Sequence, residues 1–169
     1  MKRALGRGLV LIGIVAALRW VRVTYFTEEA RVRRTLRSLL ADFNFPTGTG
    51  NIAKVARFNH VMGLFTDDIT ISLDQVVPQV PPLTGREELQ ASVQATFTLL
   101  SRCDVTLHDV VVEPISPESR DARAAFTASV VTSRPGMEFA AQEFEVNLRR
   151  NQEGRWQLAR VTAVRTLKR

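Results

Sequence analysis

Two histidines and a handful of carboxylates are the side chains of this sequence that could perform acid–base chemistry. His108 is the best single candidate for a general base, because the ordinary pKa of histidine lies near neutrality. Asp109 follows it directly, but adjacent residues of a β-strand point to opposite faces, so these two side chains cannot form a dyad. Across a sheet His108 could instead meet Asp74 or Glu143, or it could lie on a solvated sheet face. The catalytic candidates are therefore His108 and Asp74.

The other reactive side chains predict neither a nucleophile nor a metal site. Cys103 is the only cysteine and no base lies near it in the sequence, so we interpret it as a half-buried side chain at a helix end. Two histidines without a surrounding set of acidic or cysteine ligands do not make a zinc or iron site. The glycines of residues 46–50 lack the preceding strand and following lysine of a phosphate-binding loop. We expect no metal and no cofactor.

The positive charge of the chain is concentrated at its N-terminus. The 169 residues, enough for one domain, carry 23 Lys or Arg against 17 Asp or Glu, a net charge of +6. Five of the basic residues lie in residues 1–23, and no acidic residue precedes Glu28. Residues 24–169 form a nearly neutral domain, which argues against a nucleic-acid partner.

Residues 1–23 have the composition of a membrane-directed segment. A basic stretch precedes an apolar run of 11 residues at positions 8–18. This run would span only ~17 Å of a hydrocarbon core ~30 Å thick, so a membrane contact must extend over residues 8–23. We expect an uncleaved signal anchor in the cytoplasmic membrane. A cleaved signal peptide and a peripheral amphipathic segment are the alternatives.

The sequence gives conflicting indications of the side of the membrane on which the domain lies. A charged N-terminus before the first apolar segment is typical of export and favours an extracytoplasmic domain, or a secreted or periplasmic one after cleavage. Arg19, Arg22 and the arginines of the following helix argue against export, because positive flanks tend to stay in the cytoplasm. We expect the extracytoplasmic side.

Apolar residues at three- and four-residue spacing predict three helices. The first begins at Thr27, a helix cap, and carries four arginines between positions 31 and 37 that form either a solvated face or a surface for anionic lipid headgroups. The second covers residues 51–65 and ends near Gly63. The third is opened by Thr84 and Glu87, which have the spacing of a capping box. The apolar positions of these helices include Val32, Leu36, Leu39, Phe43, Phe58, Met62, Leu89, Val93 and Phe97.

The remaining elements are strands with alternating apolar and polar residues. An early strand is predicted at residues 69–73 after a turn at Asp67 and Asp68, and the proline-rich residues 77–83 cannot form a central strand. Four further strands are predicted at residues 105–114, 122–133, 138–149 and 155–167. Their order predicts an α+β fold with helices on one face of a curved, mostly antiparallel sheet. Glu143 and Glu145, with Arg160, should lie on the opposite, exposed face.

The order of these elements resembles the nuclear transport factor 2-like superfamily, in particular its SnoaL-like branch. The resemblance rests on FTDDITI at residues 65–71, TGREEL at residues 84–89 and NQEGRWQLARV at residues 151–161. It covers residues 28–167 and implies a cone-shaped, cystatin-like fold whose bent sheet wraps a long helix and leaves a pocket. With its leader, the chain looks most like anchored bacterial members of unassigned function.

The resemblance does not assign a function, because this fold hosts isomerases, dehydratases, epoxide hydrolases, ligand carriers and association domains. Steroid-isomerase-like members use a pocket tyrosine, but the only tyrosine here, Tyr25, precedes the first helix. Dehydratase-like members pair a histidine with an aspartate, which strand geometry denies to His108 and Asp109. The sequence therefore favours a protein that binds without catalysing a reaction.

Two functional hypotheses follow from these residues. The first is a membrane-tethered domain that binds a small apolar ligand or a protein partner through the pocket or the sheet face. The alternative is a small isomerase or hydrolase that acts on a lipid-like substrate with a His or Asp base. A homodimer through the sheet face is a further expectation. The candidate pocket residues are Phe43, His60, Met62, Phe65, Phe97, Phe126, Phe144 and Trp156.

Overall fold

The computed structural model describes residues 27–74, 81–136 and 138–164. The predicted leader at residues 1–23 lies outside the described residues. Within those residues, none of the helices has the length and apolar character that crossing a membrane requires.

The described chain forms three helices and one six-stranded sheet. The helices are α2 (Glu28–Phe43), α3 (Asn51–Gly63) and α4 (Arg86–Leu99). The strands are β1 (Phe65–Ser72), β2 (Leu83–Thr84), β3 (Cys103–Val112), β4 (Asp121–Thr132), β5 (Phe139–Arg150) and β6 (Trp156–Val164). The predicted α+β fold is confirmed, as are the three helices and the order of the strands.

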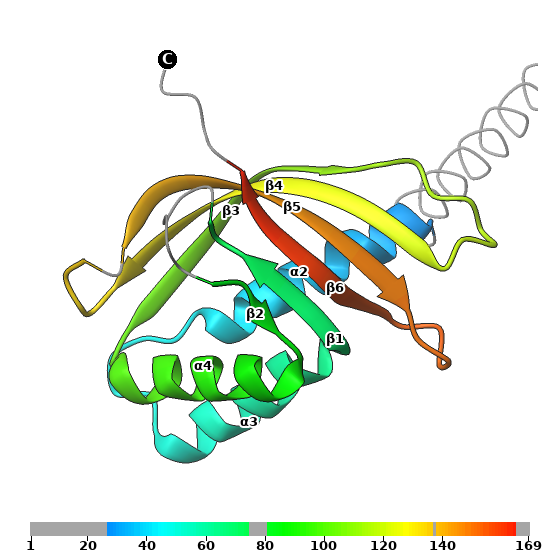
Figure 1. Ribbon diagram of the computed structural model, residues 1–169. Helices are drawn as coiled ribbons and strands as arrows, with labels where there is room; N and C mark the ends of the chain where they lie inside the picture. Colours follow the sequence, from blue (N-terminus) through cyan, green and yellow to red (C-terminus); the bar gives the residue numbers. More distant parts are fainter. Residues whose placement is uncertain (1–26, 75–80, 137, 165–169) are drawn as a thin grey trace, which may run out of the picture.

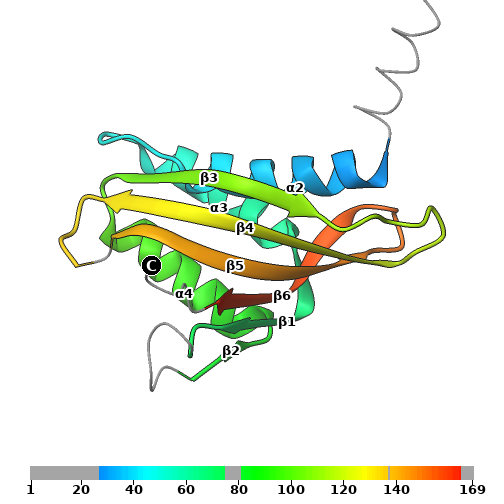
Figure 2. The same cartoon turned by 90° about the horizontal axis from the view of Figure 1, so that it is seen from above.

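The sheet is curved and mixed, and the helices lie on its concave side (Figure 1). Its strands are ordered β2-β1-β6-β5-β4-β3, and neighbours are antiparallel except β1 and β6, which are parallel. Seen from above, α2 runs along the edge of the molecule beside β3 (Figure 2). Of the proline-rich residues 77–83, those at 77–80 lie outside the described residues. Leu83 begins β2, a two-residue strand at the edge of the sheet.

Helix α2 forms as its pattern predicts. The Thr27 hydroxyl accepts a hydrogen bond from the Ala30 amide at 3.2 Å and caps the first turn. Val32 and Leu36 are almost completely buried, because the three- and four-residue spacing places them on the face turned toward the sheet.

Strand β1 corrects one prediction, because it begins at Phe65 and includes the two aspartates assigned to a turn. The register between β1 and β6 shifts between Phe65 and Thr70, which breaks the alternation that the sequence pattern requires. Asp67 pairs with Arg86 at 2.9 Å, and Asp68 pairs with Arg149 at 2.9 Å. The hydrogen bond from Arg149 lowers the pKa of the Asp68 carboxyl, whose negative charge it favours.

The capping box predicted at Thr84 and Glu87 is also wrong. Helix α4 begins one residue later than this motif requires, with Gly85 in the capping position at φ 85°. The carboxylate of Glu88, rather than that of Glu87, accepts a hydrogen bond from the Thr84 amide at 2.8 Å. A positive φ favours glycine, so the turn is set by Gly85 rather than by a side-chain cap.

The strands β3 to β6 form the predicted meander and bury one face. Phe126, Val146, Leu148 and Leu158 lie on this inward face and are all in the core. On the outer face, Arg160 lies across from Asn147 and Glu145 across from Thr162, so the expected opposite charges are not direct neighbours.

Asn44, which follows α2, connects this helix to β3. Its side-chain amide donates to the Val105 carbonyl at 3.0 Å, and its side-chain oxygen accepts from the Val105 amide. The contact joins segments 61 residues apart. Both backbone groups of Val105 therefore depend on one side chain.

We predict that Asn44→Ala lowers the free energy of unfolding by about 2 kcal/mol, because two partly buried backbone groups lose their partner. The matched control is Asn147→Ala on the exposed sheet face, with an expected change below about 0.5 kcal/mol. Urea unfolding followed by circular dichroism measures both. Equal losses in the two variants would contradict the role given to Asn44.

Candidate functional site

A cavity of about 330 Å³ lies between the helices and the concave face of the sheet. Helices α2 and α4 and strands β1 and β3 to β6 all contribute to its wall. Its apolar lining residues are Leu39, Leu40, Phe43, Phe65, Ile71, Leu89, Val93, Leu100, Val105, Phe126, Ala128, Val130, Phe144, Leu158 and Val161. The cavity thus has the size and the apolar character of a small-molecule site.

The polar atoms of the lining are few and most are already engaged. The Thr96 hydroxyl donates to the Ser92 carbonyl at 2.9 Å, and the Thr132 hydroxyl donates to the Arg134 carbonyl at 2.9 Å. Among the described residues that line this cavity there is no carboxylate, imidazole or basic side chain. The wall therefore offers no partner to a charged ligand, whose desolvation would be unfavourable.

Cys103 is the one lining residue with an ionisable side chain. It is 4% exposed and is the first residue of β3, not a half-buried residue at a helix end as predicted. Burial raises the pKa of its thiol, and the nearby Asp104 carboxylate raises it further. The thiol is therefore protonated near neutral pH and is a poor nucleophile.

The structure brings together half of the predicted pocket residues. Phe43, Phe65, Phe126 and Phe144 all line the cavity. Phe43, Phe126 and Phe144 lie on the inward faces that periodicity predicts, and the resemblance to the family implied the pocket. Phe65 lines the cavity from β1 rather than from the end of the second helix, where the sequence pattern placed it. The lining also includes small residues that the sequence reasoning missed, such as Ala128 on the same row of β4 as Phe126.

The other helical candidates lie elsewhere. Met62 is buried in the core, and Phe97 lines a separate groove of about 540 Å³ between α3 and α4, whose rim carries asparagine and glutamine side chains. His60 is exposed, and its Nδ1 contacts the Asp42 carboxylate on α2. These residues belong to helix packing and to the surface rather than to the cavity.

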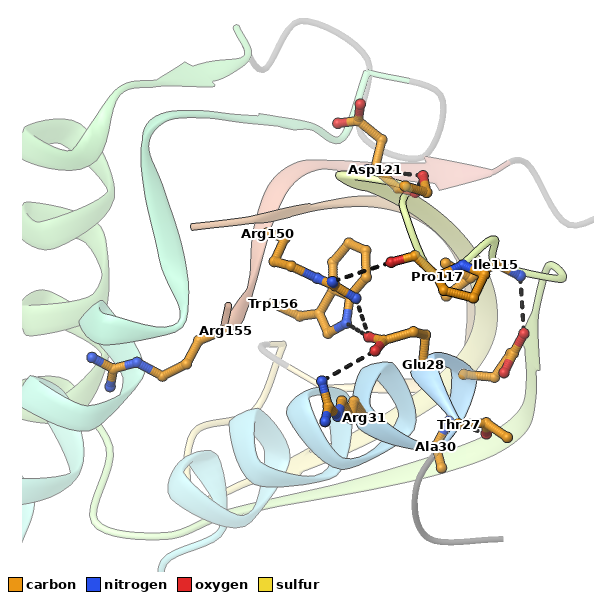
Figure 3. Close-up of polar contacts among 12 residues, drawn as sticks. Thr27, Glu28, Ala30, Arg31, Ile115, Pro117, Asp121, Arg150, Arg155 and Trp156 are labelled. Atoms are coloured by element: carbon orange, nitrogen blue, oxygen red, sulfur yellow. Dashed lines mark hydrogen bonds and ion pairs between the residues drawn. The ribbon is translucent and has the colours of Figure 1, made fainter. Parts of the chain in front are cut away.

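Trp156 is 3% exposed and belongs to a polar cluster at the start of α2 (Figure 3). Its indole Nε1 donates to the Glu28 carboxylate at 3.0 Å, and the Arg150 guanidinium lies 4.8 Å from the centre of its ring. Arg150 and Arg31 both pair with Glu28. Nothing in the local sequence connects Glu28 to Trp156, which lies 128 residues away.

The two catalytic candidates are not brought together. His108 is exposed on β3, and its Nε2 lies 3.3 Å from the Ser129 hydroxyl. Asp74 is exposed and follows β1, from which β3 is separated by three strands of the sheet. Asp109 has φ 50° at a register shift between His108 and Val111, and both His108 and Asp109 are exposed. The expected alternation of faces fails here because the strand is interrupted.

Comparison with known proteins agrees with this geometry. The SnoaL-like domain matches residues 47–162, which is more than half of the chain. The chain belongs to the SnoaL-like family. No curated protein matches the sequence.

Solved structures of the same fold are similar at low sequence identity. A Catenulispora acidiphila protein in complex with S-DNPA has a TM-score of 0.58 and 16% identity, and the match covers 79% of this chain and 91% of that one. An NTF2-like protein of unknown function from Pseudomonas putida KT2440 has a TM-score of 0.60 and 12% identity, with 83% and 87% covered. A ketosteroid isomerase-like protein from Erwinia carotovora atroseptica has a TM-score of 0.52 and 17% identity, with 82% and 95% covered. Because the identities are low, these likenesses establish the fold alone.

In the described part of this SnoaL-like protein, metal-ligating side chains are not grouped. Within the residues that the structure describes, no group of three or more His, Cys, Asp or Glu side chains could hold an ion.

We predict that Cys103 reacts with Ellman's reagent at least about 100-fold more slowly in the native chain than in urea, because the thiolate is desolvated and inaccessible. The pH at which its reaction rate is half-maximal should lie above that of the exposed thiol introduced by Ala91→Cys, since burial raises the pKa of Cys103. Absorbance after mixing measures both rates. The same midpoint for the two thiols would contradict this assignment.

Proposed function

We propose that this SnoaL-like protein is membrane-tethered and binds one small, neutral, largely apolar molecule in the cavity between its helices and its sheet. The observation that carries the proposal is the cavity of about 330 Å³ with an almost entirely apolar wall. Phenylalanine and aliphatic side chains from seven elements point into the same space. Such a wall excludes water and selects ligands by shape and apolar area.

The energetics favour neutral ligands. Each 100 Å² of apolar ligand surface removed from water contributes about 2.5 kcal/mol, at about 25 cal/mol per Å². A charged group in this cavity would lose its hydration without gaining a partner, because the described wall has no side chain of opposite charge. The ligand class we propose is therefore a hydrocarbon or aromatic molecule with at most one weakly polar group.

The placement of the titratable groups supports binding over an isomerase or hydrolase reaction. General acid–base catalysis needs a titratable group within hydrogen-bond reach of the substrate. Cys103 is the only such group in the described wall, and its raised pKa keeps it protonated near neutrality. His108 on β3 and Asp74, which follows β1, are both exposed and lie outside the cavity wall.

The tether rests on the sequence of residues 8–23. This segment combines the apolar run at residues 8–18 with Trp20, an aromatic residue suited to the membrane interface. We propose that it anchors the chain in the cytoplasmic membrane with the domain on the extracytoplasmic side.

Cavity binding is tested with Ala128→Phe, which replaces a methyl group of the wall by a benzyl group. Ala128 lines the cavity on β4 and is 4% exposed, so the new ring should fill the space a ligand needs. We expect the affinity for the neutral fluorophore N-phenyl-1-naphthylamine to fall at least tenfold, or about 1.4 kcal/mol. Fluorescence titration of the full chain in lipid nanodiscs measures this change.

The matched control is Ala125→Phe, on the same strand but with the opposite orientation of its side chain. Probe partitioning into the lipid is the same for all three chains and is subtracted. Equal affinity in the wild type, Ala128→Phe and Ala125→Phe would overturn the proposal. Thermal unfolding of each variant in the absence of probe separates loss of binding from loss of the fold.

The tether is tested by Ile14→Arg, which places a charge in the centre of the apolar run. In membranes from expressing bacteria, we expect the wild-type chain to remain with the lipid after sodium carbonate extraction and Ile14→Arg to be released, because a charge in the hydrocarbon core costs about 3 kcal/mol on insertion scales. Release of the wild-type chain would refute the tether. Protease accessibility in intact cells and in spheroplasts then reports the side on which the domain lies.

A further inference from the structure

Helix α2 carries its charges on two different faces. At 3.6 residues per turn, Arg34 lies about 160° around the helix from the buried Leu36. Arg31 and Arg37 flank Arg34 on the same outward side, and all three arginines are exposed. Small residues, namely Ala30, Ser38 and Ala41, occupy the outward positions between them. The outward face of α2 therefore consists of arginines and small residues.

The acidic side chains of α2 are turned away from this face. Glu28 is 14% exposed and is held by Arg150 and Trp156, and it also pairs with Arg31 at 3.1 Å (Figure 3). The Glu29 carboxylate accepts a hydrogen bond from the Ile115 amide at 2.9 Å, and this contact lowers the pKa of Glu29. Asp42 is 17% exposed and contacts His60 on α3. Helix α2, which is described throughout, thus directs its carboxylates toward the rest of the domain.

The position of α2 in the chain brings this face close to the predicted membrane segment. Residues 8–23 end four residues before Thr27, and a fully extended chain of four residues spans at most about 14 Å. Helix α2 is about 24 Å long. It runs along the outer edge of the domain beside β3, and no helix or strand of the described residues covers its outward side (Figure 2).

We propose that the Arg31–Arg34–Arg37 face of α2 lies against the anionic headgroups of the bilayer that holds residues 8–23. Three guanidinium groups on one face complement the phosphates of anionic lipids, and small residues between them allow close approach. Each basic residue near such a surface favours binding about fivefold, so three together favour the docked orientation about 100-fold. The inference rests on the tether but not on ligand binding in the cavity.

The test uses the full chain in vesicles of phosphatidylcholine, with and without phosphatidylglycerol. A maleimide fluorophore is attached to the thiol introduced by Ala41→Cys on the outward face of α2, or by Ala91→Cys on the exposed face of α4. Cys103 is buried, so the unsubstituted chain should take up no label. A lipid with a nitroxide headgroup quenches a fluorophore that lies at the membrane surface.

We expect strong quenching at position 41 in vesicles with phosphatidylglycerol, weak quenching in phosphatidylcholine alone, and reversal of the quenching at high salt. Position 91 should be quenched in neither. Replacing Arg31, Arg34 and Arg37 together by Gln should abolish the quenching at position 41, whereas replacing all three by Lys should retain it. Circular dichroism checks that the substituted chains are folded.

The outcomes separate this proposal from the tether. If the chain floats with the vesicles in sodium carbonate but position 41 is quenched no more than position 91, the docking of α2 is wrong and the tether stands. Quenching that survives the Gln substitutions would also overturn it, because the arginines would then not be the cause. A chain that does not float with either vesicle overturns both proposals.

Discussion

The inward apolar row of the four-strand meander is the constraint on which the rest of this structure depends. Strands β3 to β6 are each nine to twelve residues long, and every second residue must be apolar for one face of the sheet to be buried. Because the sheet is curved, this row faces inward along its whole length and meets α2 and α4. The cavity between the helices and the sheet follows from that geometry.

The cavity lies where residues smaller than phenylalanine follow Phe126 on the inward row of β4. Phe126 is followed on the same face by Ala128, Val130 and Thr132, which leave space that neither α2 nor α4 fills. Interiors are otherwise packed at close to crystal density, so an open apolar volume of this size is a feature of the fold and not a packing defect. The residues of this row line the cavity, and none of them has a side chain that could act as a general acid or base.

The polar contacts have a different role, since they fix where the helices begin and end. Asn44 holds the end of α2 on β3, and Glu28 holds its start on the β5–β6 hairpin. Both contacts use the side chain of one residue to connect distant backbone or side-chain groups. They also decide which charges of α2 face the solvent, because Glu28 and Glu29 contact the rest of the domain, whereas Arg31, Arg34 and Arg37 are exposed.

The sequence by itself determined the three helices, the strands of the meander, the inward residues of β4 to β6 and the membership of the SnoaL-like family, because periodicity and short motifs are local. Only the tertiary structure decided the start of β1, the cap of α4, the partners of Trp156 and the separation of His108 from Asp74. These depend on register shifts and on contacts between residues far apart in the chain, which no local pattern encodes. Phe43, Phe126 and Phe144 were predictable for the first reason. Phe65 and Cys103 were assigned to helix ends, because the starts of β1 and β3 depend on strand pairing.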